Sequence, residues 1–201
     1  MKDPIFYKIV KPGLAAWFKL FFRPQYEGTE NIPESGKIIL AGNHTNLLDC
    51  LLVGTSTKRC VHFIAKAELT KGIGKYIFGG LGIIPVDRSS SASGAQAVNL
   101  AEEYLKDDKL IAIFPEGTIN RTDDIMMPFK GGAVKIALDS GTKIVPFAII
   151  GKYKKFKRNV KIKFLPAIEI ERGSLKAANK KLYDTVRNEL EKASEGVNSN
   201  G

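Results

Sequence analysis

Apolar runs of strand length alternate along most of the chain with longer segments of helical periodicity. The apolar runs, rich in Val, Ile, Leu and Phe, lie at residues 37–41, 61–65, 83–86, 110–114, 144–150 and 160–165. Segments with the apolar spacing of a helix lie at residues 47–56, 68–78, 92–106, 132–139 and 175–192. This alternation predicts the α/β fold class, with a mainly parallel central sheet that is flanked by helices and whose later strands can include antiparallel members.

Residues 1–24 have a different pattern, in which bulky apolar and aromatic residues are interrupted by lysines. Lys8, Lys11 and Lys19 fall on one helical stripe, and we expect Pro12-Gly13 to kink the segment or split it into two short helices. Charges recur too often for a membrane span, which needs about 18 consecutive apolar residues. The segment is therefore predicted to be an amphipathic helical element that lies in the interface of an anionic bilayer, packs on the domain core, or does both with different faces.

The rest of the chain is predicted to form one domain and a short tail. At 201 residues and 44% hydrophobic composition, the chain can bury one sizeable core. No internal repeat or low-complexity linker interrupts residues 25–192, which we take as the domain. Residues 193–201 are expected to be a disordered tail.

Charge and cysteine content narrow the classes of partner. The formal net charge is +10, from 31 Lys and Arg against 21 Asp and Glu, which favours nucleic acid, anionic lipid or a phosphorylated substrate. Cys50 and Cys60 lie in apolar surroundings without a C-x-x-C spacing, as expected for reduced cysteines of a cytosolic protein. With His44 and His62 as the only histidines, we expect no metal and no other cofactor. We expect no signal peptide, because the N-terminal residues lack a long apolar core and a small-residue cleavage site.

Candidate chemistry is concentrated where the first apolar run of the domain ends. His44 follows residues 38–41, and Asp49 falls near the first turn of the next helix if Asn46 is the N-cap of that helix. In open α/β sheets, ligands bind in the crevice beyond the carboxyl ends of the strands. A neutral imidazole there can take a proton from an alcohol, and a carboxylate can fix its tautomer. The alternative is that His44 and Asp49 merely cap a turn and a helix.

Other predicted strands also end in polar residues. The residues that follow these strands are Lys66, Arg88, Glu116, Thr118 and Arg121. Arg88 offers a guanidinium fork to a phosphate and Lys66 offers a point charge, while Glu116 can accept hydrogen bonds from substrate hydroxyls. Taken singly, each could be an ordinary residue of a surface turn. Taken in order, they predict polar groups that converge at one edge of the sheet.

The same segments resemble the sequence blocks of the glycerolipid acyltransferases. The stretch from His44 to Asp49 matches H-x4-D, residues 82–88 resemble the second block, residues 114–118 (Phe-Pro-Glu-Gly-Thr) the third, and Val145-Pro146 the fourth. These blocks span most of the domain, and the chain is most similar to the bacterial members that acylate lysophosphatidic acid. The N-terminal segment likewise resembles the two-helix membrane-docking element of those proteins.

The resemblance implies roles for individual residues. It implies that His44 is a general base and that Asp49 orients it. The residues implied to bind the substrate, chiefly at its glycerol phosphate, are Lys66, Arg88, Glu116, Gly117 and Thr118. One position departs from the family, because Ile119 stands where the third block commonly has arginine. Arg121, two residues further on, is a candidate to reach the same phosphate.

The expected activity follows from these roles. The resemblance implies transfer of a fatty acyl group from an acyl-carrier-protein or coenzyme A thioester to the free hydroxyl of lysophosphatidic acid, without a covalent enzyme intermediate. We expect the protein to bind peripherally at the cytoplasmic face of the cell membrane, on anionic lipid, and not to bind nucleic acid. Two alternatives remain: acylation of another acceptor, such as glycerol-3-phosphate or a lyso-aminolipid, or a catalytically silent lipid-binding protein.

A basic cluster at residues 152–158 has more than one interpretation. It is a solvated loop between two strands, or a patch that binds anionic lipid. Tyr153 and Phe156 interleave with its lysines, which also suits single-stranded nucleic acid, although no RNA-binding motif is recognisable.

Overall fold

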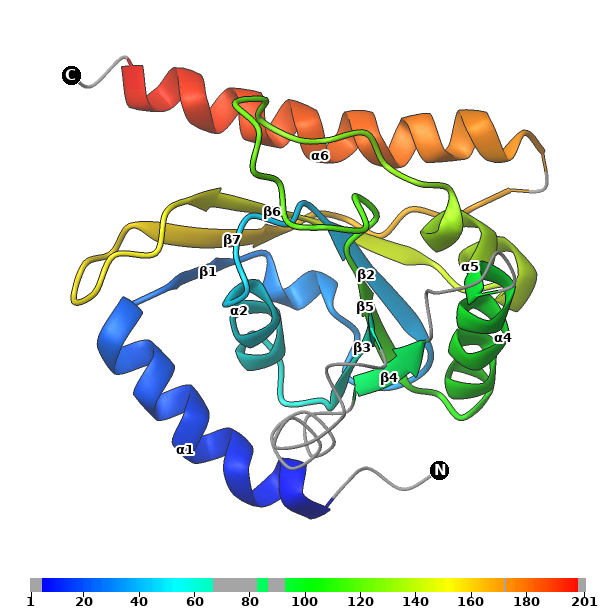
Figure 1. The fold of residues 1–201 in the computed structure, drawn as a ribbon, viewed down its shortest axis with the longest axis horizontal. Coiled ribbons are helices and arrows are strands. Elements are labelled where there is room, and N and C mark those ends of the chain that lie inside the picture. The colour runs from blue at the N-terminus through cyan, green and yellow to red at the C-terminus, as the bar shows by residue number, and fades with distance from the viewer. Residues whose placement is uncertain (1–4, 67–82, 87–92, 172, 199–201) are drawn as a thin grey trace.

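One twisted sheet forms the centre of the molecule, with helices on both of its faces (Figure 1). The computed structural model describes residues 5–66, 83–86, 93–171 and 173–198. Within these ranges seven strands pair in the order β1-β7-β6-β2-β5-β3-β4. The strands are β1 (Gln25–Glu27), β2 (Ile38–Gly42), β3 (Val61–Lys66), β4 (Ile83–Val86), β5 (Leu110–Ile113), β6 (Ile144–Gly151) and β7 (Val160–Phe164). The predicted α/β fold class is confirmed.

Most neighbouring strands run parallel, and one pair does not. Strand β2 pairs in parallel with both β5 and β6, with Leu40 opposite Ala112 on one side and Val145 on the other. Strands β6 and β7 are antiparallel, as a hairpin connection requires, which confirms the expectation of an antiparallel member late in the chain. The β2, β5, β3 and β4 strands therefore end at the same edge of the sheet.

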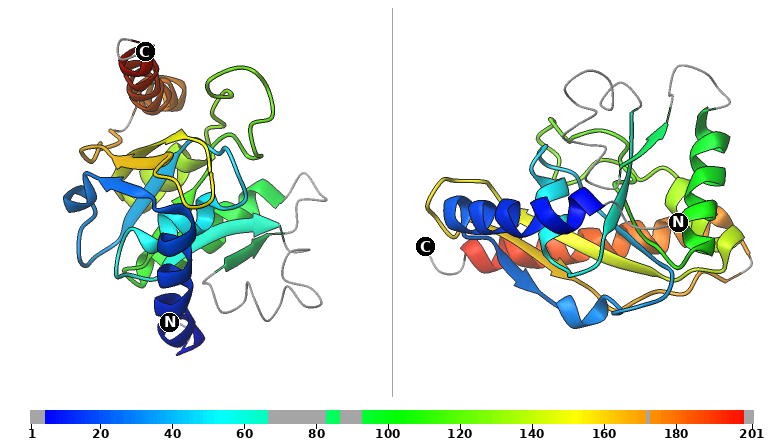
Figure 2. Two further views of the ribbon diagram at one scale, coloured as in Figure 1. Left: turned by 90° about the vertical axis from the view of Figure 1, so that its left-hand side faces the viewer. Right: turned by 90° about the horizontal axis from the view of Figure 1, so that it is seen from below.

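Side chains on the two faces of the sheet build two separate cores. The helices are α1 (Ile5–Phe22), α2 (Asp49–Thr55), α4 (Ser93–Lys106), α5 (Gly132–Ser140) and α6 (Leu175–Asn198), with a short 3-10 helix η1 (Thr29–Asn31). Leu40 packs in the core between the sheet and helices α1 and α2, which also contains Phe18 of α1. Its neighbour Ile39 packs in the core on the other face, which α4, α5 and α6 cover. This alternation is the two-residue period of a strand that is buried on both faces. Figure 2 shows α1 and α6 on opposite sides of the sheet.

Helix α1 is one continuous helix, so the prediction of two short helices split at Pro12 is wrong. Proline removes one backbone hydrogen bond inside a helix. Contacts on both sides of Pro12 hold the helix together despite that loss. Before it, the Tyr7 hydroxyl donates to the Arg59 carbonyl at 3.0 Å, and after it Phe18 is fully buried in the core.

Smaller differences concern the ends of elements. Strand β1 was not predicted, since its three residues have no apolar pattern. Helix α6 continues past the predicted end at Lys192 to Asn198, so most of the expected disordered tail is helical. The predicted helix at 68–78 lies outside the described residues. No helix in the described part of the chain is long and apolar enough to cross a membrane.

The end of β2 lies unusually close to β6. A Cβ atom on Gly42 would lie 2.2 Å from the carbonyl oxygen of Phe147, which no side chain can tolerate. Glycine at this position lets the two backbones meet at the last residue of β2. The chain then leaves the sheet in a fixed direction, toward His44.

Candidate active site

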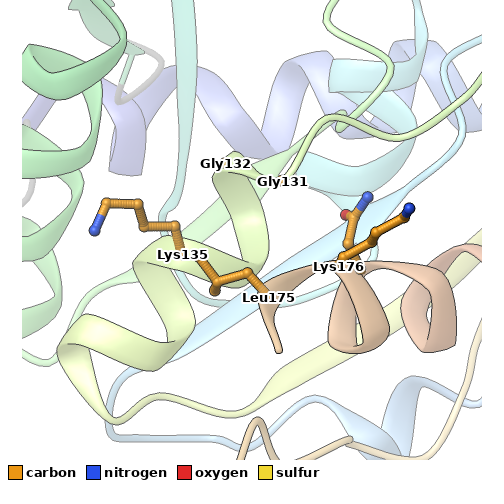
Figure 3. Close-up of a pocket in the computed structure, with 6 residues that line it drawn as sticks. Gly131, Gly132, Lys135, Leu175 and Lys176 are labelled. Atoms are coloured by element: carbon orange, nitrogen blue, oxygen red, sulfur yellow. The ribbon is translucent and has the colours of Figure 1, made fainter. Parts of the chain in front are cut away.

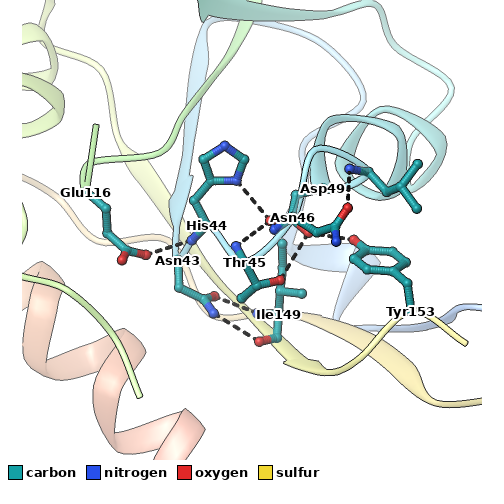
Figure 4. Close-up of polar contacts among 9 residues, drawn as sticks. Asn43, His44, Thr45, Asn46, Asp49, Glu116, Ile149 and Tyr153 are labelled. Atoms are coloured by element: carbon teal, nitrogen blue, oxygen red, sulfur yellow. Dashed lines mark hydrogen bonds and ion pairs between the residues drawn. The ribbon is translucent and has the colours of Figure 1, made fainter. Parts of the chain in front are cut away.

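The turn after β2 begins with a buried asparagine that fastens it to β6. The Asn43 side-chain amide donates to the Ile149 carbonyl at 3.0 Å, and its oxygen accepts from the Ile149 N–H at 2.7 Å (Figure 4). This reciprocal pair copies the backbone pairing of a β-ladder with a side chain. The position of the following residue, His44, is therefore set by the core of the sheet.

Asp49 organises the rest of the turn. One carboxylate oxygen, Oδ2, accepts from the backbone N–H groups of Thr45 at 2.6 Å and Asn46 at 2.8 Å. Helix α2 begins at Asp49 because these bonds hold the preceding residues in a turn. Asp49 thus lies in the first turn of the helix as predicted, but Asn46 is not the N-cap. The Asn46 side chain instead accepts from the Leu48 N–H at 3.0 Å.

The imidazole of His44 lies against this carboxylate. Its Nδ1 is 2.9 Å from Asp49 Oδ2, and the side chains are 14% and 0% exposed, respectively. The ring stacks on Phe114 with centroids 4.0 Å apart. Because a carboxylate can only accept, Nδ1 carries the hydrogen and the lone pair of the neutral ring is on Nε2. Nε2 is the ring atom that points away from Asp49 in Figure 4.

Tyr153, which follows β6, is part of the same network and was not predicted from the sequence. Its hydroxyl donates to the second carboxylate oxygen, Asp49 Oδ1, at 2.6 Å. Burial raises the pKa of Tyr153, and the negative charge of Asp49 raises it further. The phenol therefore remains a hydrogen-bond donor across the physiological pH range.

Glu116 lies directly beside His44, with its carboxylate turned toward the backbone. One oxygen accepts from the His44 N–H at 2.7 Å and the other accepts from the Met127 N–H at 2.9 Å. Burial raises its pKa, and these two hydrogen bonds act in the opposite direction. Glu116 therefore ties the His44 turn to the loop after β5. A substrate hydroxyl, which we expect Glu116 to bind, would have to donate to the lone pairs of these oxygens that the two backbone bonds do not use.

The loop after β5 places the other third-block residues near His44. Gly117 has a φ of 75°, and a Cβ there would lie 2.8 Å from the Lys130 Nζ, so this lysine packs directly over the glycine. The Asn120 N–H donates to the His44 carbonyl at 2.8 Å. Thr118 and Arg121 are exposed. Lys130 is an additional cation of this loop, and it was not among the predicted site residues.

Of the two remaining predicted residues, Lys66 lies at the same edge of the sheet. Lys66 is the last residue of β3, opposite Val86 at the end of β4, but its side chain is not described. Arg88 lies outside the described residues. Among the described residues, no three His, Cys, Asp or Glu side chains are grouped so as to hold a metal ion.

A separate pocket of about 370 Å³ lies between the start of α5 and the start of α6. It is lined by Gly131, Gly132, Lys135, Leu175, Lys176 and Asn179. Figure 3 shows the ammonium groups of Lys135 and Lys176 pointing in opposite directions, and Lys135 is paired with Asp139 at 2.6 Å. The two lysines therefore do not form a joint anion site, and the pocket contains neither His44 nor Asp49.

A histidine oriented by a buried carboxylate, at the carboxyl edge of a mainly parallel sheet, defines a class: α/β proteins equipped for general base chemistry on a bound ligand. The comparison with known proteins identifies the family within this class. The family model described as Acyltransferase matches residues 23–150, and the chain belongs to this family.

Individual relatives agree with this assignment. The chain is 34% identical over 134 residues to a 1-acyl-sn-glycerol-3-phosphate acyltransferase of Borreliella burgdorferi, covering 66% of this chain and 53% of the relative. It is 33% identical over 154 residues to the human 1-acyl-sn-glycerol-3-phosphate acyltransferase beta, covering 73% of this chain and 53% of that protein. The chain spans about half the length of these curated relatives.

A solved structure shows the same fold. The crystal structure of the 1-acyl-sn-glycerophosphate (LPA) acyltransferase PlsC from Thermotoga maritima superimposes with a TM-score of 0.74 at 25% identity. The match covers 92% of this chain and 81% of that chain. The resemblance that the sequence blocks indicated is thus confirmed at the level of family and fold.

Proposed function

We propose that this chain transfers a fatty acyl group from an acyl thioester to the free hydroxyl of lysophosphatidic acid, giving phosphatidic acid. The observation that carries the proposal is the pairing of His44 Nδ1 with the buried Asp49 carboxylate at 2.9 Å. The names of the relatives support the choice of acceptor, since several are 1-acyl-sn-glycerol-3-phosphate acyltransferases.

His44 acts as the general base in this proposal. Its Nε2 takes the proton of the acceptor hydroxyl while the hydroxyl oxygen attacks the thioester carbonyl. The carbon–sulfur bond then breaks, a carbon–oxygen ester bond remains, and the imidazolium returns its proton to the departing thiolate. Asp49 stabilises the imidazolium and fixes its tautomer. General base catalysis of this kind contributes about 10²- to 10⁴-fold to the rate.

Transfer is direct, without an acyl-enzyme intermediate. The thiol nearest to the pair in sequence is Cys50, and burial, with the adjacent negative charge of Asp49, raises its pKa to about 12. A thiol with that pKa is almost entirely protonated at neutral pH and is a poor nucleophile. Direct attack by the substrate hydroxyl therefore fits the residues around His44 better than a relay through Cys50.

Cationic groups at this edge of the sheet are proposed to hold the acceptor phosphate. Lys66 is the last residue of β3 and Arg88 comes two residues after β4 in the sequence, while Lys130 and Arg121 belong to the loop after β5. The departure at Ile119 removes the arginine that the family commonly has there. Lys130, packed over Gly117, offers a replacement charge close to the same turn.

The protein is proposed to bind peripherally at the cytoplasmic face of the membrane, where its lipid acceptor resides. Helix α1 supports this because it has two apolar faces: Phe18 is buried, whereas Ile9 and Leu20 are exposed. Exposed apolar residues on a helix that contains lysines and no acidic residue suit the interface of an anionic bilayer.

The test is acyl transfer by purified protein in the presence of liposomes, with labelled acyl groups supplied as acyl-carrier-protein and coenzyme A thioesters. We expect transfer to lysophosphatidic acid, and His44→Ala should lower kcat by about 10²- to 10⁴-fold without loss of liposome binding. Cys50→Ala should keep most of the turnover. Near-normal turnover of His44→Ala would refute the role of the imidazole, and loss of turnover in Cys50→Ala would refute direct transfer.

The choice of acceptor is tested in the same assay. Lysophosphatidylcholine, glycerol-3-phosphate and a lyso-aminolipid replace lysophosphatidic acid in parallel reactions. A preference for one of these acceptors over lysophosphatidic acid would show that the protein acts on another acceptor class within the same family. Liposome binding without transfer to any acceptor would identify a silent lipid-binding protein.

A further inference from the structure

The loop that joins β6 to β7 concentrates positive charge on one short segment. Between the two strands the chain carries Lys152, Lys154, Lys155, Lys157 and Arg158, and residues 152–159 include no acidic residue. All of these cations are exposed. Among the described residues, no carboxylate forms an ion pair with them, whereas Lys161 and Lys163 on β7 pair with Glu27 and Glu189. The charges of the loop are therefore available to a partner.

An exposed aromatic residue lies in the middle of these charges. Phe156 is 56% exposed and occupies the left-handed region with a φ of 61°, a conformation that costs free energy for a side chain of this size. Its ring lies 5.2 Å from the Phe21 ring of α1, and its N–H donates to the Phe21 carbonyl. The loop is thus fastened to the C-terminal end of α1, beside which it lies in Figure 1.

The loop and α1 together form one surface with both apolar and cationic groups. Trp17 and Leu20 of α1 are 43% and 62% exposed, and the Trp17 ring lies 5.3 Å from Phe21. Helix α1, like the loop, has no acidic residue. We call Trp17, Leu20, Phe156 and the loop cations the α1–loop surface.

We propose that the loop 152–159 is a second bilayer-contacting element, which binds together with the C-terminal half of α1 to the surface of an anionic phospholipid membrane. Lysine and arginine near an anionic leaflet are attracted to it, and aromatic side chains occupy the boundary between headgroups and acyl chains. An acidic protein or a nucleic acid would pair with the cations alone. An anionic bilayer pairs with the cations and also gives the exposed side chains of Phe156, Trp17 and Leu20 an apolar environment.

The same loop connects this surface to the candidate active site. Tyr153 lies at the base of the loop, and its ring contacts Phe18 at 6.2 Å and Phe22 at 5.8 Å between centroids. Its hydroxyl donates to Asp49, the partner of His44. Contact of the loop with lipid would therefore fix the orientation of the His44 turn relative to the membrane. Membrane contact by the loop rests on the proposed function only in that both take place at a bilayer, and lipid binding can be measured without acyl transfer.

Tryptophan fluorescence tests the contact directly, because Trp17 is the single tryptophan of the chain. In the variant Trp17→Phe/Phe156→Trp, emission reports on the loop alone. We expect a blue shift, and quenching by brominated acyl chains, with vesicles that contain phosphatidylglycerol but not with pure phosphatidylcholine. If the emission of this variant stays unchanged on vesicles that shift wild-type Trp17, the proposal is wrong. A response to acyl carrier protein or to an oligonucleotide, without one to vesicles, overturns it too.

Charge removal provides a second, independent measurement. At roughly fivefold in partitioning per cation near an anionic surface, Lys154→Gln/Lys155→Gln/Lys157→Gln should weaken binding to phosphatidylglycerol vesicles on the order of 100-fold. The matched control is Lys176→Gln/Lys181→Gln/Lys192→Gln on α6, across the sheet from α1. Equal weakening by both triple variants would show a response to net charge alone and would overturn the assignment to the loop. Circular dichroism confirms that each variant is folded.

Discussion

At the scale of single residues, the carboxylate of Asp49 accepts more hydrogen bonds than any other group of the site. It accepts from two backbone N–H groups, from His44 Nδ1 and from the Tyr153 hydroxyl, and it is fully buried. Burying a carboxylate is costly unless hydrogen bonds replace its hydration. The contacts of Asp49 supply that replacement and also fix its position. His44 is therefore oriented by a group that cannot move without losing several bonds at once.

Replacing Tyr153 tests this arrangement. In Tyr153→Phe the ring contacts remain, but Asp49 loses one donor, so we expect the free energy of unfolding to fall by about 1.5–3 kcal/mol, as for hydrogen bonds to charged groups. The kcat should fall while KM changes little, because Asp49 is freer to turn away from His44. Urea unfolding and steady-state kinetics measure the two effects.

Tyr26→Phe is the matched control for that change. Its hydroxyl shares a 2.7 Å hydrogen bond with the neutral Thr55 hydroxyl, so it should cost only about 0.5–1.5 kcal/mol and leave kcat unaltered. Equal effects of the two substitutions on kcat would contradict a positioning role for Tyr153.

The sequence predicted those members of the site that are near one another in the chain. His44 and Asp49 are five residues apart; the spacing left their pairing open, and the resemblance to the H-x4-D block favoured it. Tyr153 is 104 residues from Asp49, and Glu116 is 72 residues from the His44 N–H that it binds. Such contacts depend on which strands become neighbours. The orientation of Glu116 toward the backbone likewise had no local signal.

At the scale of elements, α1 shows how one helix serves two environments. Trp17 and Phe18 are adjacent in sequence, yet Trp17 is 43% exposed and Phe18 is 0% exposed. Phe18 belongs to the core that α1 and α2 share with the sheet. The expectation that such a segment packs on the core with one face, and offers another to lipid, is therefore met for the packed face. The lipid-facing role remains a prediction.

Two alanine substitutions separate these faces. Phe18→Ala should lower the free energy of unfolding by about 3–5 kcal/mol, because it leaves a cavity in the core. Trp17→Ala should lower it by on the order of 1 kcal/mol, since only part of the ring is buried. Liposome co-sedimentation should show the opposite order, with weaker binding for Trp17→Ala than for Phe18→Ala at temperatures where both are folded. The same order in both measurements would argue against a two-faced helix.

Elements were predictable where the apolar pattern is strong and local. The core strands were found to within a residue or two, because they are buried on both faces and bounded by polar turns. Helix α1 was predicted to break at Pro12, and the contacts of Tyr7 and Phe18 that keep it continuous are tertiary. Strand β1 forms because Tyr26 pairs with Ile162 of β7. Its three residues are exposed or half-exposed, so their own sequence pattern does not indicate this pairing.

At the scale of the whole molecule, the strand order brings the site together. Strand β2 lies between β6 and β5, so the His44 turn meets Ile149 through Asn43 on one side and Glu116 on the other. The alternating pattern predicted a parallel sheet but could not give this order, because crossover connections leave no mark in the local sequence. Parallel pairing determines that the polar groups gather at the carboxyl edge of the sheet. The strand order determines which of these groups lie next to one another.

The layer of α1 and α2 also contains ionisable groups whose burial makes stability depend on pH. Burial lowers the pKa of Lys11 from 10.5 to about 8 and raises that of Cys50 from 9.0 to about 12. Between pH 8 and 10.5 the unfolded chain keeps a Lys11 proton that the folded chain has lost, so the free energy of unfolding rises with pH. Between pH 9 and 12 the folded chain keeps a Cys50 proton that the unfolded chain has lost, so the free energy falls.

Urea unfolding of the wild type, Lys11→Met and Cys50→Ala between pH 7 and 11 resolves the two contributions. The difference in free energy of unfolding between wild type and Lys11→Met should increase from pH 8 to 10.5, because only the wild type gains from losing that proton. The difference between wild type and Cys50→Ala should decrease above pH 9, since only in the wild type does unfolding expose a thiol that ionises at that pH while the folded chain keeps its proton. Opposite slopes for these two differences would show that burial in this layer disfavours the charged forms of Lys11 and Cys50. Differences that do not vary with pH would show that folding does not shift these two pKa values, and would contradict their burial between the helices and the sheet.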